Sequence, residues 1–144
     1  YWSKDGNAEG MCKGPADMDD FRMKFDSLEE QQEDPDSIYN YVKQVIRVRN
    51  QNPVIARGTT AYLEQYSGEQ CFALTRSYEG SNLLLLGNTS AEAVSVDLTG
   101  LTVGGTTAEE LVLLGELYTG EETAERAGTV VTLPAYSILI LGEE

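Results

Sequence analysis

Histidine is absent from the 144 residues of this sequence. This excludes nucleophilic sites of the Ser–His and Cys–His kinds, and it removes the commonest protein ligand of transition metals. Cysteine is almost as scarce, with Cys12 and Cys71 as its two examples. Because two distant cysteines make neither a zinc site nor a disulfide framework, we expect two free thiols, with Cys71 in or near the core.

Long apolar runs are also missing. The longest, Leu83–Leu86 and Ile138–Leu141, have the length of a β-strand, whereas a membrane-spanning helix needs roughly 20 apolar residues. We therefore predict no membrane partner. The chain opens with YWSK, which is neither an initiating methionine nor the start of a signal peptide. We expect it to be cut from a longer protein that continues upstream of Tyr1.

Basic residues are few, since 10 Lys and Arg face 24 Asp and Glu and leave a net charge of -14. Residues 1–36 carry 11 acids and 4 bases, residues 37–58 carry 4 bases and no acid, and residues 59–144 carry 13 acids and 2 bases. Such a field repels phosphate backbones, so we predict no nucleic-acid partner and a preference for uncharged ligands. Acidic chains are common among secreted bacterial proteins, which favours an extracellular or cell-surface location over the cytoplasm.

The most regular stretch is DPDSIYNYVKQVIRVRNQNP, which spans Asp34–Pro53. It predicts one amphipathic helix with Asp34 as its N-cap, Pro35 at its first position and Asn52-Pro53 as its end. Basic residues gather toward its C-terminal end, which suits the helix dipole. The spacing predicts a single buried stripe of Ile38, Tyr41, Val42, Val45 and Val48, with Ile46 at its margin.

The sequence that follows has the alternating pattern and frequent turns of an antiparallel Greek-key β-sandwich, so the fold class is mainly β. The predicted strands are Thr60–Tyr66, Gln70–Tyr78, Leu83–Gly87, Ala93–Leu98, Glu110–Leu117, Thr129–Leu133 and Tyr136–Leu141. Glu110–Leu117 also has helical propensity, but its place between Gly-rich turns favours a strand. Residues 120–128 read as an acidic loop.

Residues 1–33 have no sustained periodicity and predict an irregular loop. Their large apolar side chains are too many for a free linker, so we expect the loop to pack on a surface. One short helical turn is predicted near its end, where Ser27 and Glu30 have the spacing of a capping box.

Candidate chemistry is limited to carboxylates and surface aromatics. Asp17, Asp19 and Asp20 have oxygen ligands of the kind that Ca²⁺ prefers, but they lack EF-hand spacing, and a solvated acidic loop is the better interpretation. Asn88-Thr89-Ser90 fits an N-glycosylation sequon, a pattern that is frequent by chance. The residues alone therefore indicate an accessory β-domain with a helix and a loop attached.

Three strand tyrosines suggest an alternative. Exposed Tyr62, Tyr66 and Tyr78 have rings suited to stacking on sugars, which would make this a carbohydrate-binding module, although ordinary strand aromatics are the commoner explanation.

The stretch DPDSIYNYVKQVIRVRNQNPVIARG resembles the last barrel helix and barrel exit of the α-amylase family of glycoside hydrolases (glycoside hydrolase family 13). The matching positions are Pro35, Ser37, Asn40, Tyr41, Lys43, Ile46, Arg49, Asn52, Pro53 and Gly58. Tyr1-Trp2 resembles the end of the family's "PMQW" motif, which lies in the loop after the eighth barrel strand. CFALTRSYEGSNLLLLGNTS and PAYSILIL resemble strands of its C-terminal domain.

This resemblance implies a loop after the last barrel strand at 1–33, the last (β/α)8-barrel helix at 34–54 and a C-terminal all-β domain at 55–144. It further implies a retaining hydrolase of starch or maltodextrin. The family's catalytic Asp, Glu and second Asp lie on barrel strands four, five and seven, upstream of Tyr1. No catalytic residue therefore transfers to this chain.

The implied role is a non-catalytic portion that braces the barrel, with Tyr1 and Trp2 near bound sugar. No cofactor or metal site is implied within the chain, and calcium is left open for the parent enzyme. The implied partners are the α-glucan and the rest of the barrel. An uncovered helical stripe would favour self-association of the isolated chain. The choice among α-amylase, neopullulanase, oligo-1,6-glucosidase and trehalose-forming relatives depends on barrel loops upstream.

Overall fold

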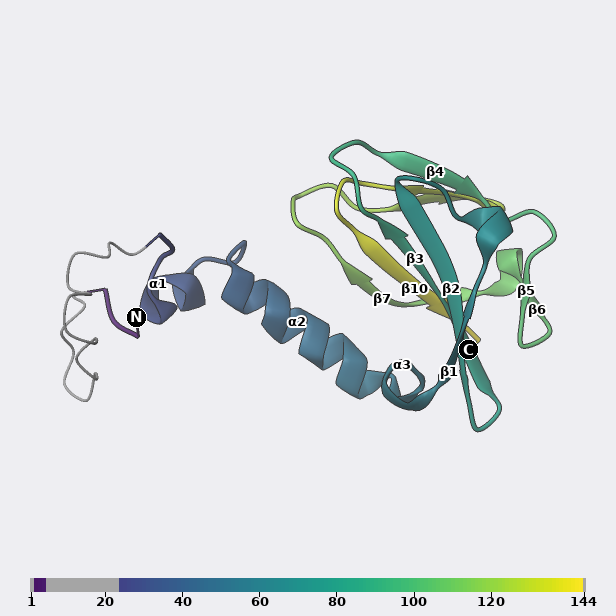
Figure 1. Cartoon of the computed structure of the whole chain (residues 1–144), viewed down its shortest axis with the longest axis horizontal. Coiled ribbons are helices and arrows are strands. Elements are labelled where there is room, and N and C mark those ends of the chain that lie inside the picture. The colour runs from purple at the N-terminus through teal and green to yellow at the C-terminus, as the bar shows by residue number, and fades with distance from the viewer. Residues whose placement is uncertain (1, 5–23, 144) are drawn as a thin grey trace. The chain divides into compact units, whose positions relative to one another are not determined.

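The computed structural model describes residues 2–4 and 24–143. The chain divides into two compact units, an N-terminal unit of Tyr1–Lys43 and a C-terminal unit of Gln44–Glu144 (Figure 1). Most of the loop predicted for residues 1–33 lies outside the described residues. Within the described ranges, no helix combines the length and apolar character needed to cross a membrane.

In the described part of the chain, three helices precede the β-strands: α1 (Leu28–Glu33), α2 (Ile38–Gln51) and α3 (Pro53–Arg57). The predicted turn after Ser27 is confirmed as α1, and Ser27 and Glu30 form the expected capping box. The end of α2 at Gln51 matches the stop predicted at Asn52-Pro53. Pro53 does not begin a strand region directly, because it occupies the first position of α3.

The predicted start of the long helix at Asp34 is wrong. Asp34 is the C-cap of α1, and its backbone N–H donates to the Glu30 carbonyl at 3.1 Å. The cap of α2 falls three residues later, where the Asn40 N–H donates to the Ser37 hydroxyl oxygen at 3.2 Å. Because α1 ends at Asp34, Ser37 caps the start of α2 in its place.

The single buried stripe predicted along this helix is also wrong, because no residue of α2 is buried. Val45 and Val48 are half-buried. Ile38, Val42 and Ile46 are 65%, 46% and 51% exposed, respectively. Ile46 and Val48 lie about 160° apart around the helix axis, since each residue adds about 100°, and the other apolar residues lie between them. The apolar residues of α2 therefore form one broad face, which is half-buried at its Val48 edge and open at its Ile46 edge.

The strands form an antiparallel β-sandwich, which confirms the predicted fold class. One sheet has five strands in the order β1-β2-β3-β10-β7, a second has the order β4-β9-β8, and β5 pairs with β6. The strand bounds are β1 Thr59–Tyr62, β2 Cys71–Tyr78, β3 Ser81–Asn88, β4 Val94–Asp97, β5 Thr102–Val103, β6 Thr106–Thr107, β7 Val112–Leu117, β8 Glu125–Ala127, β9 Val130–Leu133 and β10 Ile138–Gly142. The choice of strand for Glu110–Leu117 is confirmed by β7.

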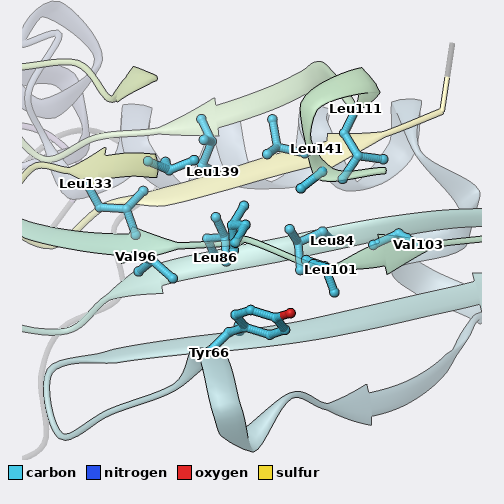
Figure 2. Close-up of a cluster of buried hydrophobic side chains, with 14 residues drawn as sticks. Tyr66, Leu84, Leu86, Val96, Leu101, Val103, Leu111, Leu133, Leu139 and Leu141 are labelled. Atoms are coloured by element: carbon cyan, nitrogen blue, oxygen red, sulfur yellow. The ribbon is translucent and has the colours of Figure 1, made fainter. Parts of the chain in front are cut away.

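The core lies between the two larger sheets, where Figure 2 shows its leucines facing one another. Leu84 and Leu86 of β3 are fully buried and pair across the sheet with Leu141 and Leu139 of β10. The shorter sheet adds Val96 of β4, whose side chain belongs to the same cluster of buried residues. The all-apolar run of β3 is explained by its central place between β2 and β10.

Two segments depart from the predicted strands. β1 ends at Tyr62, and residues Glu64–Tyr66 form a 3₁₀ turn, η1, in place of the predicted strand end. The Ser67 hydroxyl causes this departure, because it accepts the Ala73 N–H at 2.9 Å and so takes the place of a ladder partner. The predicted acidic loop at 120–128 contains β8, so that prediction was incomplete.

Arg126 of β8 connects three backbone segments of the C-terminal unit. Its guanidinium donates to the carbonyl oxygens of Leu111 at 2.6 Å and Gly128 at 3.3 Å, and also to that of Ala108. Ala108 belongs to a second 3₁₀ turn, η2 (Ala108–Glu110). One side chain therefore holds η2, the start of β7 and the turn after β8 together.

Candidate functional site

Trp2 is the described member of the predicted sugar-contacting pair, and Tyr1 lies outside the described residues. The Trp2 side chain is 69% exposed. Its position is fixed through its backbone, because the Glu29 N–H donates to the Trp2 carbonyl at 3.1 Å and the Lys4 N–H donates to the Glu29 carboxylate at 3.3 Å. The start of α1 thus holds the backbone of Trp2 in place while its indole ring remains exposed.

The capping box of α1 completes this anchor. The Ser27 hydroxyl donates to the Glu30 carboxylate at 2.7 Å, and the Ser27 N–H donates to the same oxygen at 3.0 Å. These hydrogen bonds from Ser27 lower the pKa of Glu30. Lys4 lies 3.9 Å from Glu30 in an ion pair between exposed side chains, which contributes little by itself.

The residues that match the family pattern between α1 and α2 have a structural purpose. The Asn40 amide donates to the Gln31 carbonyl at 3.0 Å and to the Asp34 carbonyl at 2.7 Å. The Ser37 hydroxyl donates to the same Gln31 carbonyl at 2.5 Å. The side chains of Ser37 and Asn40 therefore pair with the free backbone carbonyls at the end of α1. Their match to the family pattern is explained by helix capping rather than by a catalytic role.

In the C-terminal unit, the last two turns of α2 contact β7. The Gln44 amide donates to the Glu116 carbonyl at 3.3 Å. Gly115 leaves room for Val48, because a Cβ at Gly115 would lie 3.0 Å from a Val48 methyl carbon. This close approach of a helix to a strand requires a glycine, or another very small residue, at position 115.

α3 is fixed to the same sheet by arginines. Arg76 of β2 donates through Nε to the Val54 carbonyl at 3.3 Å. Arg57 lies over the ring of Tyr78 at 6.0 Å from its centroid. Tyr78 is half-buried, and the Arg57 guanidinium covers a face of its ring, so little of the ring is left for stacking on a sugar.

The other two tyrosines of the predicted sugar-binding set differ in their exposure to solvent. The expectation that Tyr66 is exposed is wrong, because its side chain is 9% exposed and its ring packs against the core (Figure 2). Its hydroxyl donates to the Thr99 carbonyl at 3.2 Å. Tyr62 is 61% exposed and borders a pocket of about 370 Å³ with η1 and the loop after β4.

Three of the described carboxylates are unsuited to the general-acid role of a hydrolytic pair. A general acid needs a raised carboxyl pKa, whereas hydrogen bonds from neighbouring hydroxyl and backbone groups lower the pKa of Glu30, Asp97 and Glu110. Within the described ranges, no three His, Cys, Asp or Glu side chains gather to hold a metal ion. The three aspartates weighed for calcium at 17, 19 and 20 lie outside these ranges.

Asn88 of the sequon is a structural residue. Its side chain is 3% exposed, and its amide donates to the carbonyls of Glu92 at 2.7 Å and Pro134 at 2.9 Å. A buried, hydrogen-bonded amide is inaccessible to glycosylation in the folded chain. The hydrogen bonds of Asn88 therefore give this residue a structural role in the turn after β3. Cys71 is a half-buried free thiol beside the core, as predicted.

Solved structures resemble nearly the whole chain. Amy13B of Eubacterium rectale is 38% identical, with a TM-score of 0.87 over 99% of this chain and 26% of that one. An α-amylase from H. orenii is 23% identical, with a TM-score of 0.63 over 83% of this chain and 23% of that one. Trehalulose synthase MutB from Pseudomonas mesoacidophila MX-45 is 24% identical, with a TM-score of 0.63 over 81% and 20%.

The likenesses to the H. orenii enzyme and to MutB show the fold alone. The chain spans about a quarter of the length of the solved chains that it matches. No protein-family model matches the chain. No curated protein matches it either.

Proposed function

Because this chain is the C-terminal part of an α-amylase-family (glycoside hydrolase family 13) enzyme, we propose that it braces the catalytic barrel of a starch- or maltodextrin-hydrolysing protein. In this proposal the chain supplies no catalytic group. The observation that carries it is the likeness to Amy13B, which extends over almost every residue of the chain at 38% identity.

The contacts of α2 support a bracing role. Gln44 and Val48 connect the helix to β7 through a hydrogen bond and a close packing contact. Ile46 points away from that contact and is 51% exposed. Val42 lies on the same side of the helix as Ile46 because of its four-residue spacing. A helix whose broad apolar face contacts the β-domain at one edge and is open at the other is suited to joining the β-domain to the rest of a barrel.

Two assays test whether the isolated chain lacks hydrolytic activity and whether the parent enzyme needs the β-domain. The isolated 144 residues are expected to release no reducing sugar from starch, because the family's three catalytic carboxylates lie upstream. Deleting the parent enzyme from Ala56 onward is expected to cost solubility or activity, since the deletion removes the whole β-domain. Release of reducing sugar by the isolated chain, or a soluble and fully active truncated enzyme, would contradict the proposal.

A single substitution tests the bracing contact itself. Gly115→Val places methyl groups where Val48 packs, and overpacking of this kind costs about 1–3 kcal/mol. Valine is otherwise favoured in strands, so strand propensity does not account for a loss. Gly120→Val is the matched control, because a Cβ at Gly120 meets no atom within 4 Å in the described structure. Equal unfolding midpoints of the two variants in the parent enzyme would refute this contact as a brace.

We also propose that Trp2, with Tyr1, contacts bound sugar in the parent enzyme. Trp2 is 69% exposed while its carbonyl is tied to α1, an arrangement that presents an aromatic ring at a fixed place. Trp2→Ala in the parent enzyme is expected to raise KM for maltodextrin with an unchanged unfolding temperature. An unchanged KM would remove Trp2 from the substrate site.

A second candidate function is carbohydrate binding by the β-domain. The observation that favours it is Tyr62, since this ring is exposed beside a pocket, whereas Tyr66 is buried and Tyr78 carries Arg57. This candidate is compatible with bracing, because Tyr62 belongs to β1 and the bracing contact belongs to β7.

A further inference from the structure

We propose that the pocket beside Tyr62 binds neutral sugar units of an α-glucan. The identity of the glucan rests on the proposed function of the parent enzyme, whereas the site itself rests on the geometry of the C-terminal unit. The pocket has a volume of about 370 Å³, which lies within the range of small-molecule sites, about 300–1,000 Å³. It is formed by the end of β1, the turn η1 and the loop between β4 and β5.

Tyr62 supplies the apolar platform. It is the last residue of β1, a strand at the edge of the five-stranded sheet, and 61% of its surface is exposed. Its hydroxyl has no hydrogen-bond partner among the described residues. Aromatic rings with one polar tip favour surfaces that are apolar on one side and wet on the other. The C–H face of a pyranose, which is rimmed by hydroxyl groups, is such a surface.

The walls of the pocket are held rigidly. Tyr66 also lines the pocket, and its buried ring is fixed by its hydrogen bond to Thr99. The Ser67 hydroxyl donates to the Leu63 carbonyl at 2.8 Å and accepts from Ala73, which fixes η1. On the other side, the Leu101 N–H donates to the Leu98 carbonyl at 3.0 Å. A preformed pocket loses little conformational entropy on binding, so weak contacts suffice for measurable affinity.

The polar groups at the rim define the class of ligand. Glu64, Gln65 and Thr102 line the pocket, and their side chains have no hydrogen-bond partner among the described residues. They offer a carboxylate, an amide and a hydroxyl group to ligand hydroxyls. None of the lining residues is Lys or Arg. A carboxylate within a strongly acidic domain repels phosphorylated or acidic sugars, so the ligand is a neutral one.

Affinity electrophoresis of the 144-residue chain in native gels tests the site. Amylopectin is expected to retard the wild-type chain, and Tyr62→Ala is expected to weaken binding roughly tenfold, which corresponds to the loss of one aromatic stacking contact. Tyr62→Phe keeps the ring and is expected to remain retarded. The matched control is Tyr136→Ala, because Tyr136 is 52% exposed on the same unit and lines neither this pocket nor the bracing contact.

The outcomes separate this site from the bracing role. Unretarded migration of the wild-type chain, or equal retardation of Tyr62→Ala and Tyr136→Ala, would overturn the site and leave the Gly115→Val test of bracing untouched. Retardation by a neutral β-glucan but not by amylopectin would overturn the assignment to α-glucan. Retardation by alginate, an anionic polysaccharide, would overturn the charge argument.

Discussion

Replacing Asn88 with alanine is the most informative single change in the β-domain. Its amide group donates to three backbone carbonyls, those of Glu92 at 2.7 Å, Leu133 at 3.2 Å and Pro134 at 2.9 Å. Its carbonyl oxygen accepts the backbone N–H and the hydroxyl of Ser90, each at 2.9 Å. Since β3 and β9 belong to different sheets, this one side chain connects both layers of the sandwich.

The magnitude follows from burial. Asn88 is 3% exposed, so water does not replace the lost donors freely. A net hydrogen bond is worth about 0.5–1.5 kcal/mol, and a buried group left without its partner costs about 1–3 kcal/mol. With the Leu133 and Pro134 carbonyls buried and deprived of this donor, we expect Asn88→Ala to destabilise the chain by roughly 2–4 kcal/mol. In a domain of about 100 residues this lowers Tm by roughly 8–30 °C.

Urea and thermal unfolding of the 144-residue chain measure the loss. Asn82→Ala is the matched control, because Asn82 lies on the same strand but is half-buried and donates to one carbonyl, that of Gly80. It is expected to cost less than about 1 kcal/mol. Asn88→Asp keeps the shape but loses the donors, and its penalty is expected to grow as pH rises above about 4, where the new carboxylate ionises in the unfolded chain. The reasoning is refuted if Asn88→Ala costs no more than Asn82→Ala.

Three further sets of substitutions are expected to change stability in stated directions. Glu79 and Gly80 form the two-residue β2–β3 turn with φ of 50° and 87°, so Glu79→Asn is expected to raise Tm by a few degrees and Gly80→Ala to lower it. Arg126→Lys keeps the charge but loses the planar fork that reaches three carbonyls, and a loss of about 1–3 kcal/mol is expected in urea unfolding. Hydrogen bonds lower the pKa of Asp97 and Glu110 from their ordinary values of 3.8 and 4.5, so their stabilisation is present above those values and lost as pH falls through the folded-state pKa. Tm measured from pH 7 to pH 3 is expected to fall in acid, less steeply in Asp97→Asn and Glu110→Gln, and parallel curves would contradict this assignment.

Local patterns predicted those parts of the fold that local forces decide. The alternation in Ala93–Leu98 and the apolar run at Leu83–Leu86 predicted the strands β4 and β3, because these patterns follow from strand geometry and burial. The Ser27 capping box was predictable for the same reason, since its partners are three residues apart. The helix start was not, because the choice between Asp34 and Ser37 as cap depends on how α1 ends.

Side-chain hydrogen bonds to backbone groups of other segments decided the features that the sequence did not reveal. The end of β1 depends on the Ser67 hydroxyl meeting Ala73, and the burial of Tyr66 depends on a carbonyl 33 residues away. Strand alternation predicted that Tyr62 and Tyr66 lie on the same face of one strand. In the structure the chain turns at η1, so Tyr62 is exposed to solvent and Tyr66 is buried in the core. The exposure of Ile46 could not be predicted from helical spacing, because spacing identifies apolar residues but not what covers them.

The position of β10 has a consequence for how the chain folds during synthesis. This strand is made last among the ten, yet it lies between β3 and β7 in the middle of its sheet. About 50 residues separate Asn88 from Ile138, which takes a ribosome roughly 2.5–10 s at about 5–20 residues per second. Throughout that interval the leucine-rich edge of β3 lacks its native neighbour, and an unpaired apolar edge of this kind recruits other chains. The β-domain is therefore exposed to misassembly until β10 has been made, so a nascent-chain chaperone would be needed during that interval.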